Sequence, residues 1–366
     1  MVVVTGAAGA LGRRVLALLA EDPAIERIVA VDLVEPMEPG SKVEVHGLDL
    51  ATADLSAVVA GASAVVHLAF AVGQALDDAA TGRANAAATR RLLAAAADAG
   101  VRHLVVMSSA TVYGAWRTNP VPLTEAEPVR PNPELAYAVQ KAEVERLCQA
   151  FTDEHPDSTV SVLRPAVMVG GEEESWLARS LRATLGLRNV AGTAPLQLVH
   201  IDDLASAVDV ARRCRLDGPS NVAPDGWLDA PAAQALAGTP ARLPLPAPAA
   251  RVLASVSWRY HLAQTPPGLV AYTTASWVVA NDRITDAGWR PAYSNEEAYV
   301  VGTPGTPWSR LSPKRRQELA LGTAGTVILG AAAAVLALVS RRRRRSQVPV
   351  SAPRAARSRR GSRPGG

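Results

Sequence analysis

Cysteine and phenylalanine are scarce in this sequence. Only two of each occur among 366 residues, and the cysteines, Cys148 and Cys214, form no metal-ligand pattern. We therefore expect no metal site, and two reduced core residues rather than a disulfide. The chain still has 48% hydrophobic and 20% charged residues, which is typical of a globular protein with a sizeable core.

Acidic residues are absent from the last part of the sequence. Ten arginines follow Ser340, and no Asp or Glu lies among them. The net charge of +4 therefore hides a body that is acidic by about six charges. Such a body lacks the basic surface that grips nucleic acid, so we expect no nucleic-acid partner.

A secretory signal is also missing from the sequence. MVVVTG opens directly with a strand pattern, without a basic segment or a cleavage site before it. We therefore expect the body of the chain to fold in the cytoplasm.

Short β-rich runs alternate with Ala-rich helical stretches as far as Pro165. The predicted strands cover 2–6, 25–33, 43–50, 64–70, 103–109 and 159–165, and the predicted helices cover 10–22, 84–100 and 134–151. Continuous apolar strands separated by helices indicate a parallel sheet covered on both faces. Beyond Pro165 the alternation weakens, although 199–214 looks like a strand end followed by a helix that returns to the core.

A glycine-rich loop, TGAAGALG, joins the first predicted strand to the first predicted helix. Gly6 allows a tight turn, Gly9 lets the backbone approach a pyrophosphate, and Gly12 lets helix and strand pack closely. The N-terminus of the helix adds free N–H groups for an anion. The pattern predicts a dinucleotide bound to a Rossmann-type doubly wound parallel sheet, an α/β fold.

Asp32 ends the second predicted strand, twenty residues after Gly12. A carboxylate at this place can bond both ribose hydroxyls and would repel a 2′-phosphate, which favours NAD. Arg13 and Arg14 leave NADP open, because a nearby arginine could serve that phosphate; alternatively, both belong to a solvated helix face.

YAVQK places Tyr137 and Lys141 four residues apart on one helix face. Ser109 lies at the carboxyl end of the strand 103–109, where ligands bind in open α/β sheets, and Asn85 lies in the preceding helix. A pair spaced like Tyr137 and Lys141 can also be an ordinary surface pair, so the pattern gains its meaning from the residues around it.

These motifs together resemble the extended branch of the short-chain dehydrogenase/reductase superfamily, the NAD-dependent epimerase/dehydratase family. The resemblance covers about residues 1–300. The further blocks that carry it are GLDL, HLAF, NAAATRRLL, SSATVYG, LRPAVMVG, VHIDDLASA and NDRITDAGWRPAYSNEEA.

The resemblance implies a catalytic set. Tyr137 would be the general acid/base, and Lys141 would favour its phenolate and hold the ribose hydroxyls. Ser109 would orient the substrate oxygen, and Asn85 would support the lysine. The hydride would move between a substrate carbon and the nicotinamide. Thr111 could offer a second hydroxyl.

The resemblance also implies cofactor contacts beyond the glycine loop. Asp49 in GLDL would contact the adenine, and further contacts would come from Leu50, Ala69, Arg164 and Pro165. We expect His67 and His200 to be structural, and Asp202 and Asp203 to cap a helix. By analogy with the family, the helices near 84–100 and 134–151 could form a homodimer.

Departures from the family pattern bear on the substrate. Ala110 and Thr111 replace the Asp-Glu pair of the dehydratases, Val167 replaces an asparagine typical of the epimerases, and 195–198 lacks their diphosphate-gripping arginine. We therefore favour redox of a small-molecule secondary alcohol or ketone. A nucleotide-sugar epimerase and a non-catalytic NAD(P)-binding sensor or scaffold at the membrane remain alternatives.

The segment from Leu319 to Ser340 contains no charge and is followed at once by five arginines. It is long enough to cross a hydrocarbon core of about 30 Å, although it could also be a buried or peripheral Ala-rich helix. The positive-inside rule would place the arginines inside and the enzyme outside, against the cytoplasmic expectation. The arginines either cross or turn back onto anionic headgroups.

We expect a cytoplasmic catalytic domain anchored to the cytoplasmic membrane. The predicted parts are a cofactor-binding core over 1–165 with 194–215 returning to it, a smaller substrate-binding region over 166–301, a linker over 302–317, a transmembrane helix over 318–340, and a disordered Arg-rich tail over 341–366.

Overall fold

The computed structural model describes residues 1–34, 40–72, 79–170, 175–187, 194–237, 252 and 266–302. All of these belong to one compact unit, Met1–Gly305. The predicted transmembrane helix over 318–340 and the Arg-rich tail over 341–366 lie outside the described residues. Within the described ranges, no helix is both long and apolar enough to cross a bilayer.

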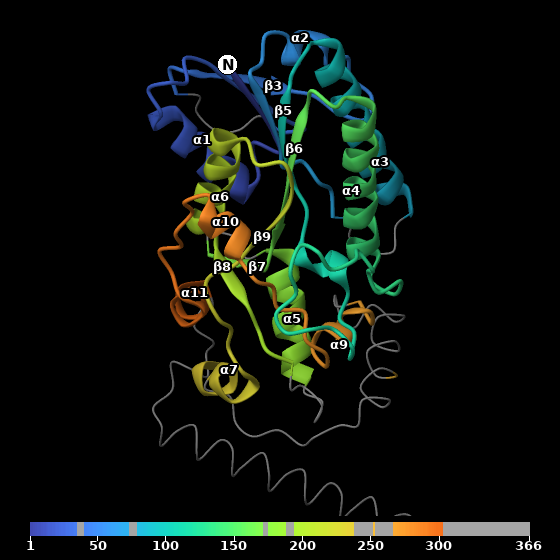
Figure 1. The fold of residues 1–366 in the computed structure, drawn as a ribbon, viewed down its shortest axis with the longest axis vertical. Helices are drawn as coiled ribbons and strands as arrows, with labels where there is room; N and C mark the ends of the chain where they lie inside the picture. Colours follow the sequence, from blue (N-terminus) through green and yellow to red (C-terminus); the bar gives the residue numbers. More distant parts are fainter. Residues whose placement is uncertain are drawn as a thin grey trace, which may run out of the picture. The chain divides into compact units, whose positions relative to one another are not determined.

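Seven parallel strands form the central sheet, in the order β3-β2-β1-β4-β5-β6-β9 (Figure 1). They are β1 (Val2–Thr5), β2 (Ile28–Asp32), β3 (Val43–Gly47), β4 (Ala64–His67), β5 (His103–Met107), β6 (Thr159–Pro165) and β9 (Gly218–Val222). The strand order reverses direction at β1, which pairs with both β2 and β4. This arrangement confirms the predicted Rossmann-type sheet and places its ligand crevice at the carboxyl end of β1.

Helices cover both faces of the sheet because successive strand residues point to opposite sides. Val2 and Val4 pack with α1 (Ala10–Glu21) and α6 (Ile201–Cys214). Val3 packs on the other face with α2 (Ser56–Val59), α3 (Ala79–Asp98) and α4 (Ala136–Glu154). Figure 1 shows α1 and α6 on one side of the sheet and α3 and α4 on the other.

The strand β9 was not predicted, because its sequence GPSNV is a poor strand pattern. Pro219 cannot donate a ladder hydrogen bond, and such a residue is tolerated at a sheet edge. β9 is the edge strand and pairs only with β6 in the sheet order. Its buried Asn221 is fixed by a carboxylate, since the amide N–H of Asn221 donates to Glu125 over 2.8 Å.

A second apolar cluster lies beyond the carboxyl edge of the sheet. It includes Val112 of the 3-10 helix η1 (Ala110–Tyr113), Leu177 of α5 (Trp176–Leu187) and Leu269 of α9 (Leu269–Tyr272). The other elements of this part are the parallel pair β7 (Val167–Val169) and β8 (Leu198–His200), and the helices α7 (Ala230–Ala237), α10 (Asp282–Asp286) and α11 (Asn295–Gly302).

The prediction that Asp202 and Asp203 cap a helix is wrong, because the N-cap is His200. Asp203 instead binds a later segment of the chain. It lies in the first turn of α6. Its buried carboxylate accepts hydrogen bonds from the amides of Ala292 (2.7 Å) and Tyr293 (3.1 Å), and burial raises its pKa. The indole of Trp289 donates to the Asp203 carbonyl over 3.1 Å. The block NDRITDAGWRPAY is thereby tied to the core.

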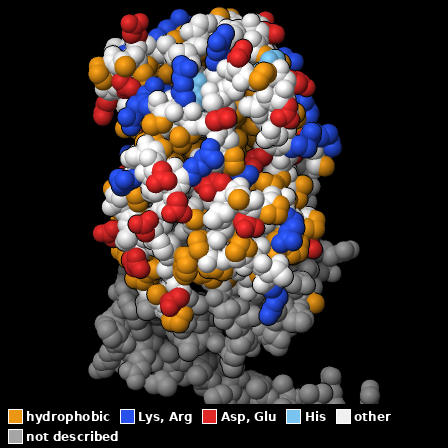
Figure 2. Space-filling view, in the orientation of Figure 1, with side chains coloured by type: hydrophobic (Ala, Val, Ile, Leu, Met, Phe, Trp, Pro, Cys, Tyr) orange, Lys and Arg blue, Asp and Glu red, His pale blue; other side chains and the backbone are white. Residues whose placement is uncertain are grey.

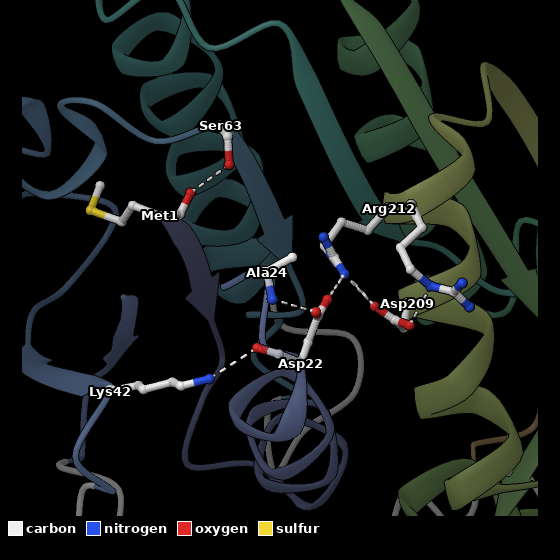
Figure 3. A network of polar contacts seen from close by, with 8 residues as sticks. Met1, Asp22, Ala24, Lys42, Ser63, Asp209 and Arg212 are labelled. Atoms are coloured by element: carbon white, nitrogen blue, oxygen red, sulfur yellow. Dashed lines mark hydrogen bonds and ion pairs between the residues drawn. The ribbon is translucent and has the colours of Figure 1, made fainter. Parts of the chain in front are cut away.

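Polar contacts join several elements at the amino edge of the sheet (Figure 3). Asp22, at the end of α1, accepts from Arg212 of α6 over 2.8 Å, and its carbonyl accepts from Lys42 over 2.9 Å. Ser63, just before β4, donates to the Met1 carbonyl over 2.8 Å. These contacts lie at the end of the strands opposite to the ligand crevice.

The two cysteines differ in their surroundings, and both are free. Cys148 is buried on α4, as expected for a core residue, and burial raises the pKa of its thiol to about 12. Cys214 is exposed at the end of α6, so the prediction of a core residue is wrong there. Its place in a run of arginines at the end of an amphipathic helix explains the difference.

Charged side chains of both signs are interspersed over the face drawn in Figure 2. Hydrophobic side chains are more frequent in the lower half of that view. Neither sign forms an unbroken patch on this face.

Candidate active site

The glycine loop packs so closely on neighbouring backbone that Gly6 and Gly12 leave no space for a side chain. Gly6 has a φ of +73°, and a Cβ at this residue would lie 2.5 Å from the Ala69 nitrogen. A Cβ at Gly12 would lie 2.1 Å from the Gly6 carbonyl oxygen. No side chain caps Gly9 at the start of α1, so the helix N-terminus is open to an anion. This cradle fits the pyrophosphate of a dinucleotide.

Asp32 turns its carboxylate toward the same loop. It accepts hydrogen bonds from the amides of Ala8 (2.9 Å) and Leu33 (2.7 Å). Arg14 is paired with Asp202 over 3.2 Å, so its charge already has a partner on α6. Arg13 donates to the Ala8 carbonyl over 2.7 Å and stays beside the loop.

Asp49 and Leu50 follow β3 and lie in the turn where the resemblance places the adenine. Asp49 is exposed, and its carboxylate accepts from the Ala51 amide over 2.9 Å and the Thr52 hydroxyl over 3.1 Å. Leu50 is buried in the core. The carboxylate therefore shapes its own turn, and contact with a cofactor stays a prediction.

Lys141 is buried at the centre of the site. Its side chain reaches from α4 to the end of β5, where Nζ donates to the Met107 carbonyl over 2.8 Å. The Nζ atom also lies 3.7 Å from the ring centroid of Phe70, a cation–π contact. Burial lowers the pKa of Lys141 to about 7, and the negative charge of Glu145 acts in the opposite direction.

Tyr137 lies one helical turn before Lys141, between two aromatic rings. Its ring centroid is 5.7 Å from that of Phe70, edge to face, and 5.3 Å from that of Trp176. Burial raises the pKa of Tyr137 to about 12, although a hydrogen bond with the Ser109 side chain lowers it. The protein alone therefore keeps this phenol protonated at neutral pH.

Ser109 follows β5 and forms the N-cap of η1. Its oxygen accepts from the Thr111 amide over 3.2 Å and from the Thr111 hydroxyl over 2.9 Å. The Thr111 carbonyl in turn accepts from Tyr272 over 2.8 Å. The fold thus joins the hydroxyl of Ser109 to those of Thr111 and Tyr137, and Lys141 lies one helical turn after Tyr137. The catalytic roles of these residues stay a prediction.

Asn85 lies near the set but is bonded elsewhere. Its side chain exchanges two hydrogen bonds with the Ala71 backbone, at 2.8 and 2.9 Å, and donates to Gln140 over 3.3 Å. These contacts fix the segment after β4, which carries Phe70, to α3 and α4. The predicted support of Lys141 is therefore indirect in this structure, through the loop that covers it.

His67 lies under the site as a structural residue, as expected. Its ring nitrogens are bonded to the hydroxyls of Thr5 (2.8 Å) and Thr89 (3.1 Å), and Thr89 donates to the Asn85 carbonyl. Burial, helped by the charge of Lys141, lowers the pKa of His67 to about 3. The ring is neutral at physiological pH.

Arg164, predicted to contact the cofactor, directs its guanidinium into the protein. Its Nε and Nη2 donate to Glu145, the latter over 2.6 Å, and its Nη1 donates to the Tyr113 hydroxyl over 2.7 Å. Pro165 next to it pairs with Val222 in the sheet. A cofactor contact at either residue stays a prediction.

Three neighbours of the catalytic set were missed in the sequence. Glu145 follows Lys141 by one helical turn, a spacing that could have indicated a partner. Phe70 stands in the quoted block HLAF, but nothing local shows that its ring covers Lys141. Trp176 lies beyond Pro165, where no regular pattern indicated a packing direction.

The comparison with family models settles the class of protein. Residues 2–222 match the model of the NAD dependent epimerase/dehydratase family. The chain belongs to this family, which confirms the resemblance, and the family's description agrees with the predicted cofactor, NAD.

Two relatives are similar to this chain in sequence. An uncharacterized protein of Mycobacterium tuberculosis is 29% identical over 311 residues, which are 82% of this chain and 82% of the relative. A 4-hydroxy-2-methyl-3-oxo-4-farnesyl-3,4-dihydroquinoline-1-oxide ketoreductase of Stigmatella aurantiaca is 30% identical over 187 residues, or 49% of this chain and 54% of the relative.

Solved structures share the fold at low identity. MoeE5 in complex with UDP-glucuronic acid and NAD matches 82% of this chain and 96% of its own, with a TM-score of 0.61 and 22% identity. A UDP-N-acetylglucosamine 4-epimerase from Methanobrevibacter ruminantium M1 matches 82% and 96%, with a TM-score of 0.62 and 18% identity. Likeness at this level establishes the architecture only.

Proposed function

We propose that the protein is an NAD-dependent oxidoreductase that moves a hydride between the nicotinamide and an apolar secondary alcohol or ketone. The proposal rests on the residues that surround Tyr137. Its hydroxyl meets Ser109, and its ring lies between Phe70 and Trp176. Aromatic walls with a few hydroxyls suit an uncharged substrate better than a diphosphate.

The residues divide the chemistry of such a reaction between them. Ser109 orients the substrate oxygen, and Tyr137 exchanges a proton with it: the phenolate accepts the alcohol proton, and the phenol returns one to the ketone. Lys141 stabilises the phenolate by its positive charge, against the burial that raises the pKa of Tyr137 to about 12. When bound, NAD supplies the hydride acceptor.

The charges near the site also favour an uncharged substrate. Arg164 is neutralised by Glu145, and all three of its guanidinium nitrogens have partners. Within 195–198, the side-chain amide of Gln197 donates to the carbonyls of Gly226 and Val279 and accepts from the Val279 amide. Neither residue offers a free donor to a diphosphate.

The Stigmatella aurantiaca relative supports the same class of reaction. Its name describes a ketoreductase acting on a farnesyl-bearing quinoline oxide. The alignment covers 49% of this chain, so it bears on the reaction type more than on the substrate. The nucleotide-sugar epimerase alternative draws on solved epimerase structures of 17–21% identity, which establish the fold alone.

The experiment compares wild type, Tyr137→Phe and Tyr293→Phe, the last as a tyrosine whose ring packs on His200. Each is supplied with NADH and a panel of prenylated or polycyclic ketones in micelles, and separately with NAD⁺ and UDP-glucose. We expect NADH oxidation with the ketones by wild type and Tyr293→Phe, and about a 10³-fold loss in Tyr137→Phe. Interconversion of the UDP-sugar without net NADH change would instead establish the epimerase.

The proposed location of the protein rests on the sequence beyond the described residues. We propose that 318–340 anchors the enzyme to the cytoplasmic membrane, where apolar substrates collect. Cell fractionation would compare the full chain with a chain ending at residue 317. Full-length protein that stays with carbonate-washed membranes, and truncated protein that does not, is the expected result; full-length protein in the supernatant would contradict it.

A further inference from the structure

A buried ion pair lies behind the catalytic set and takes no part in the proposed chemistry. Glu145 on α4 is 9% exposed, and Arg164 at the end of β6 is 5% exposed. The guanidinium grips the carboxylate in a fork, with Nε–Oε1 at 3.0 Å and Nη2–Oε2 at 2.6 Å. Such a fork fixes orientation as well as distance.

This ion pair reaches both ends of the segment that carries Ser109. The Ser108 hydroxyl donates to the Glu145 carboxylate. At the other end of the segment, Arg164 donates to the Tyr113 hydroxyl over 2.7 Å and lies 4.8 Å from the Tyr113 ring centroid. The backbone between these two anchors contains Ser109 and Thr111.

The same pair is fixed to the helix that carries the proton-transfer residues. Glu145 follows Lys141 by four residues and Tyr137 by eight, so the three lie along one face of α4. A displacement of the Ser108–Tyr113 segment from this face would move the Ser109 oxygen away from the Tyr137 hydroxyl.

We propose that Glu145 and Arg164 are positioning residues that hold Ser109 in register with Tyr137 and Lys141. The expected loss of turnover rests on the proposed function. The expected change in NADH binding rests on NAD being the cofactor. A buried ion pair contributes little to stability compared with an apolar pair, whereas its fixed geometry suits a positioning role.

The pair also acts on the charge of Lys141. Glu145 and Cys148 face the ammonium from α4, His67 from β4, and Phe70 from the segment after β4. Both His67 and Cys148 are neutral at pH 7 because burial shifts the pKa of each away from its charged form. Glu145 is therefore the negative group that raises the pKa of Lys141.

The test uses full-length Glu145→Gln and Ser108→Ala, with Glu143→Gln as the matched control. Glu143 lies on the same helix but pairs with Arg146 on the surface over 2.8 Å. Measurements are kcat and KM for the ketone, the NADH dissociation constant from pH 5 to 9, and circular dichroism. Lys141 is predicted to hold the ribose, so the NADH affinity should fall as the ammonium loses its proton.

We expect kcat to fall about 100-fold in Glu145→Gln and about 10-fold in Ser108→Ala, with KM changed little. The pH midpoint of NADH binding should move down by about 1 unit in Glu145→Gln and stay in place in Ser108→Ala. Glu143→Gln should match wild type in every readout.

Folded Glu145→Gln with wild-type kcat and an unmoved midpoint would overturn the inference. If Glu145→Gln fails to fold, an unchanged kcat in Ser108→Ala would overturn it. If wild type turns over no ketone, the proposed function fails, and the NADH midpoint in Glu145→Gln alone decides the inference.

Discussion

Charged side chains have different surroundings at the two edges of the central sheet. At the amino edge, Arg212 meets Asp22 and Asp209 at 2.8 and 2.7 Å, and all three side chains keep some contact with water. At the carboxyl edge, Lys141 is 4% exposed, and its Nζ faces a carbonyl and an aromatic ring. In the first arrangement the charges are paired and partly hydrated, whereas in the second the burial of Lys141 disfavours its charge despite these two contacts.

The pKa values express this difference. Asp22 has a lowered pKa, first because the Ala24 amide bonds its carboxylate and further because Arg212 is close, so its charge is favoured in the folded state. Tyr137 and Lys141 are shifted toward their neutral forms by burial. Such shifts concentrate at functional sites, because a protein gains no stability from them. Charge is thus favoured at the amino edge and disfavoured at the carboxyl edge.

The largest effect should come from distorting the cofactor cradle with a single methyl group. Gly12→Ala places a Cβ 2.1 Å from the Gly6 carbonyl oxygen, so the loop must shift. We expect NADH affinity, measured by fluorescence titration, to fall by about 100-fold or more. Gly40→Ala is the control, because nothing lies within 4 Å of its Cβ. Equal affinities in the two variants would contradict the assigned cradle.

Lys141→Met should stabilise the protein while abolishing turnover. Burial lowers the pKa of Lys141 from 10.5 to about 7, so the charged lysine costs folding free energy below pH 7. We expect the variant to be more stable by about 2–4 kcal/mol at pH 6, in urea unfolding. The gain should shrink between pH 7 and 10.5, where the native lysine is neutral and the unfolded one is charged. A destabilised variant at pH 6 would contradict the comparison.

Arg212→Met should show the reverse behaviour at the amino edge. The variant loses two carboxylate partners and leaves Asp22 and Asp209 near each other, so we expect Tm to fall by about 2–4 °C. Turnover should equal that of wild type. The difference in Tm should vanish at low pH, where the carboxylate of Asp22, with its lowered pKa, finally takes up a proton. A loss of kcat without unfolding would show that the two edges are coupled.

Ser63→Ala should have the smallest effect. It removes one exposed hydrogen bond, to the Met1 carbonyl, at the start of β1. We expect a change of about 0.5 kcal/mol or less in the free energy of unfolding, and no change in activity. A larger loss would mean that this hydrogen bond stabilises the first strand more than its exposed position indicates.

The sheet could be predicted because its strands carry strong local patterns. VVVT, IVAVD and HLVVM are apolar except for one terminal residue each, as expected of strands covered on both faces, and the glycine loop fixes the first crossover. The edge strand β9 escaped prediction because Pro219 and two polar residues belong to it, and only pairing with β6 defines it.

The site was predictable as a set of residue types but not as a set of contacts. The Tyr137 hydroxyl is bonded to the Ser109 side chain, and Lys141 follows Tyr137 by one turn of α4. The partners of Asn85 and Arg164 could not be predicted, because Ala71 and Glu145 are distant in sequence and are brought near by packing of α3, α4 and β6. The ring of Phe70 over Lys141 is likewise a tertiary contact with no local signal.

The most direct test of the central claim follows the hydride itself. NADH dideuterated at nicotinamide C4 would be incubated with a prenylated aromatic ketone and the full-length protein, and the product alcohol would be weighed by mass spectrometry. The account predicts one deuterium on the carbinol carbon with wild type and Tyr293→Phe, and no alcohol with Tyr137→Phe. No labelled alcohol from wild type, together with interconversion of UDP-sugars in the presence of NAD⁺ and without net NADH formation, would contradict it.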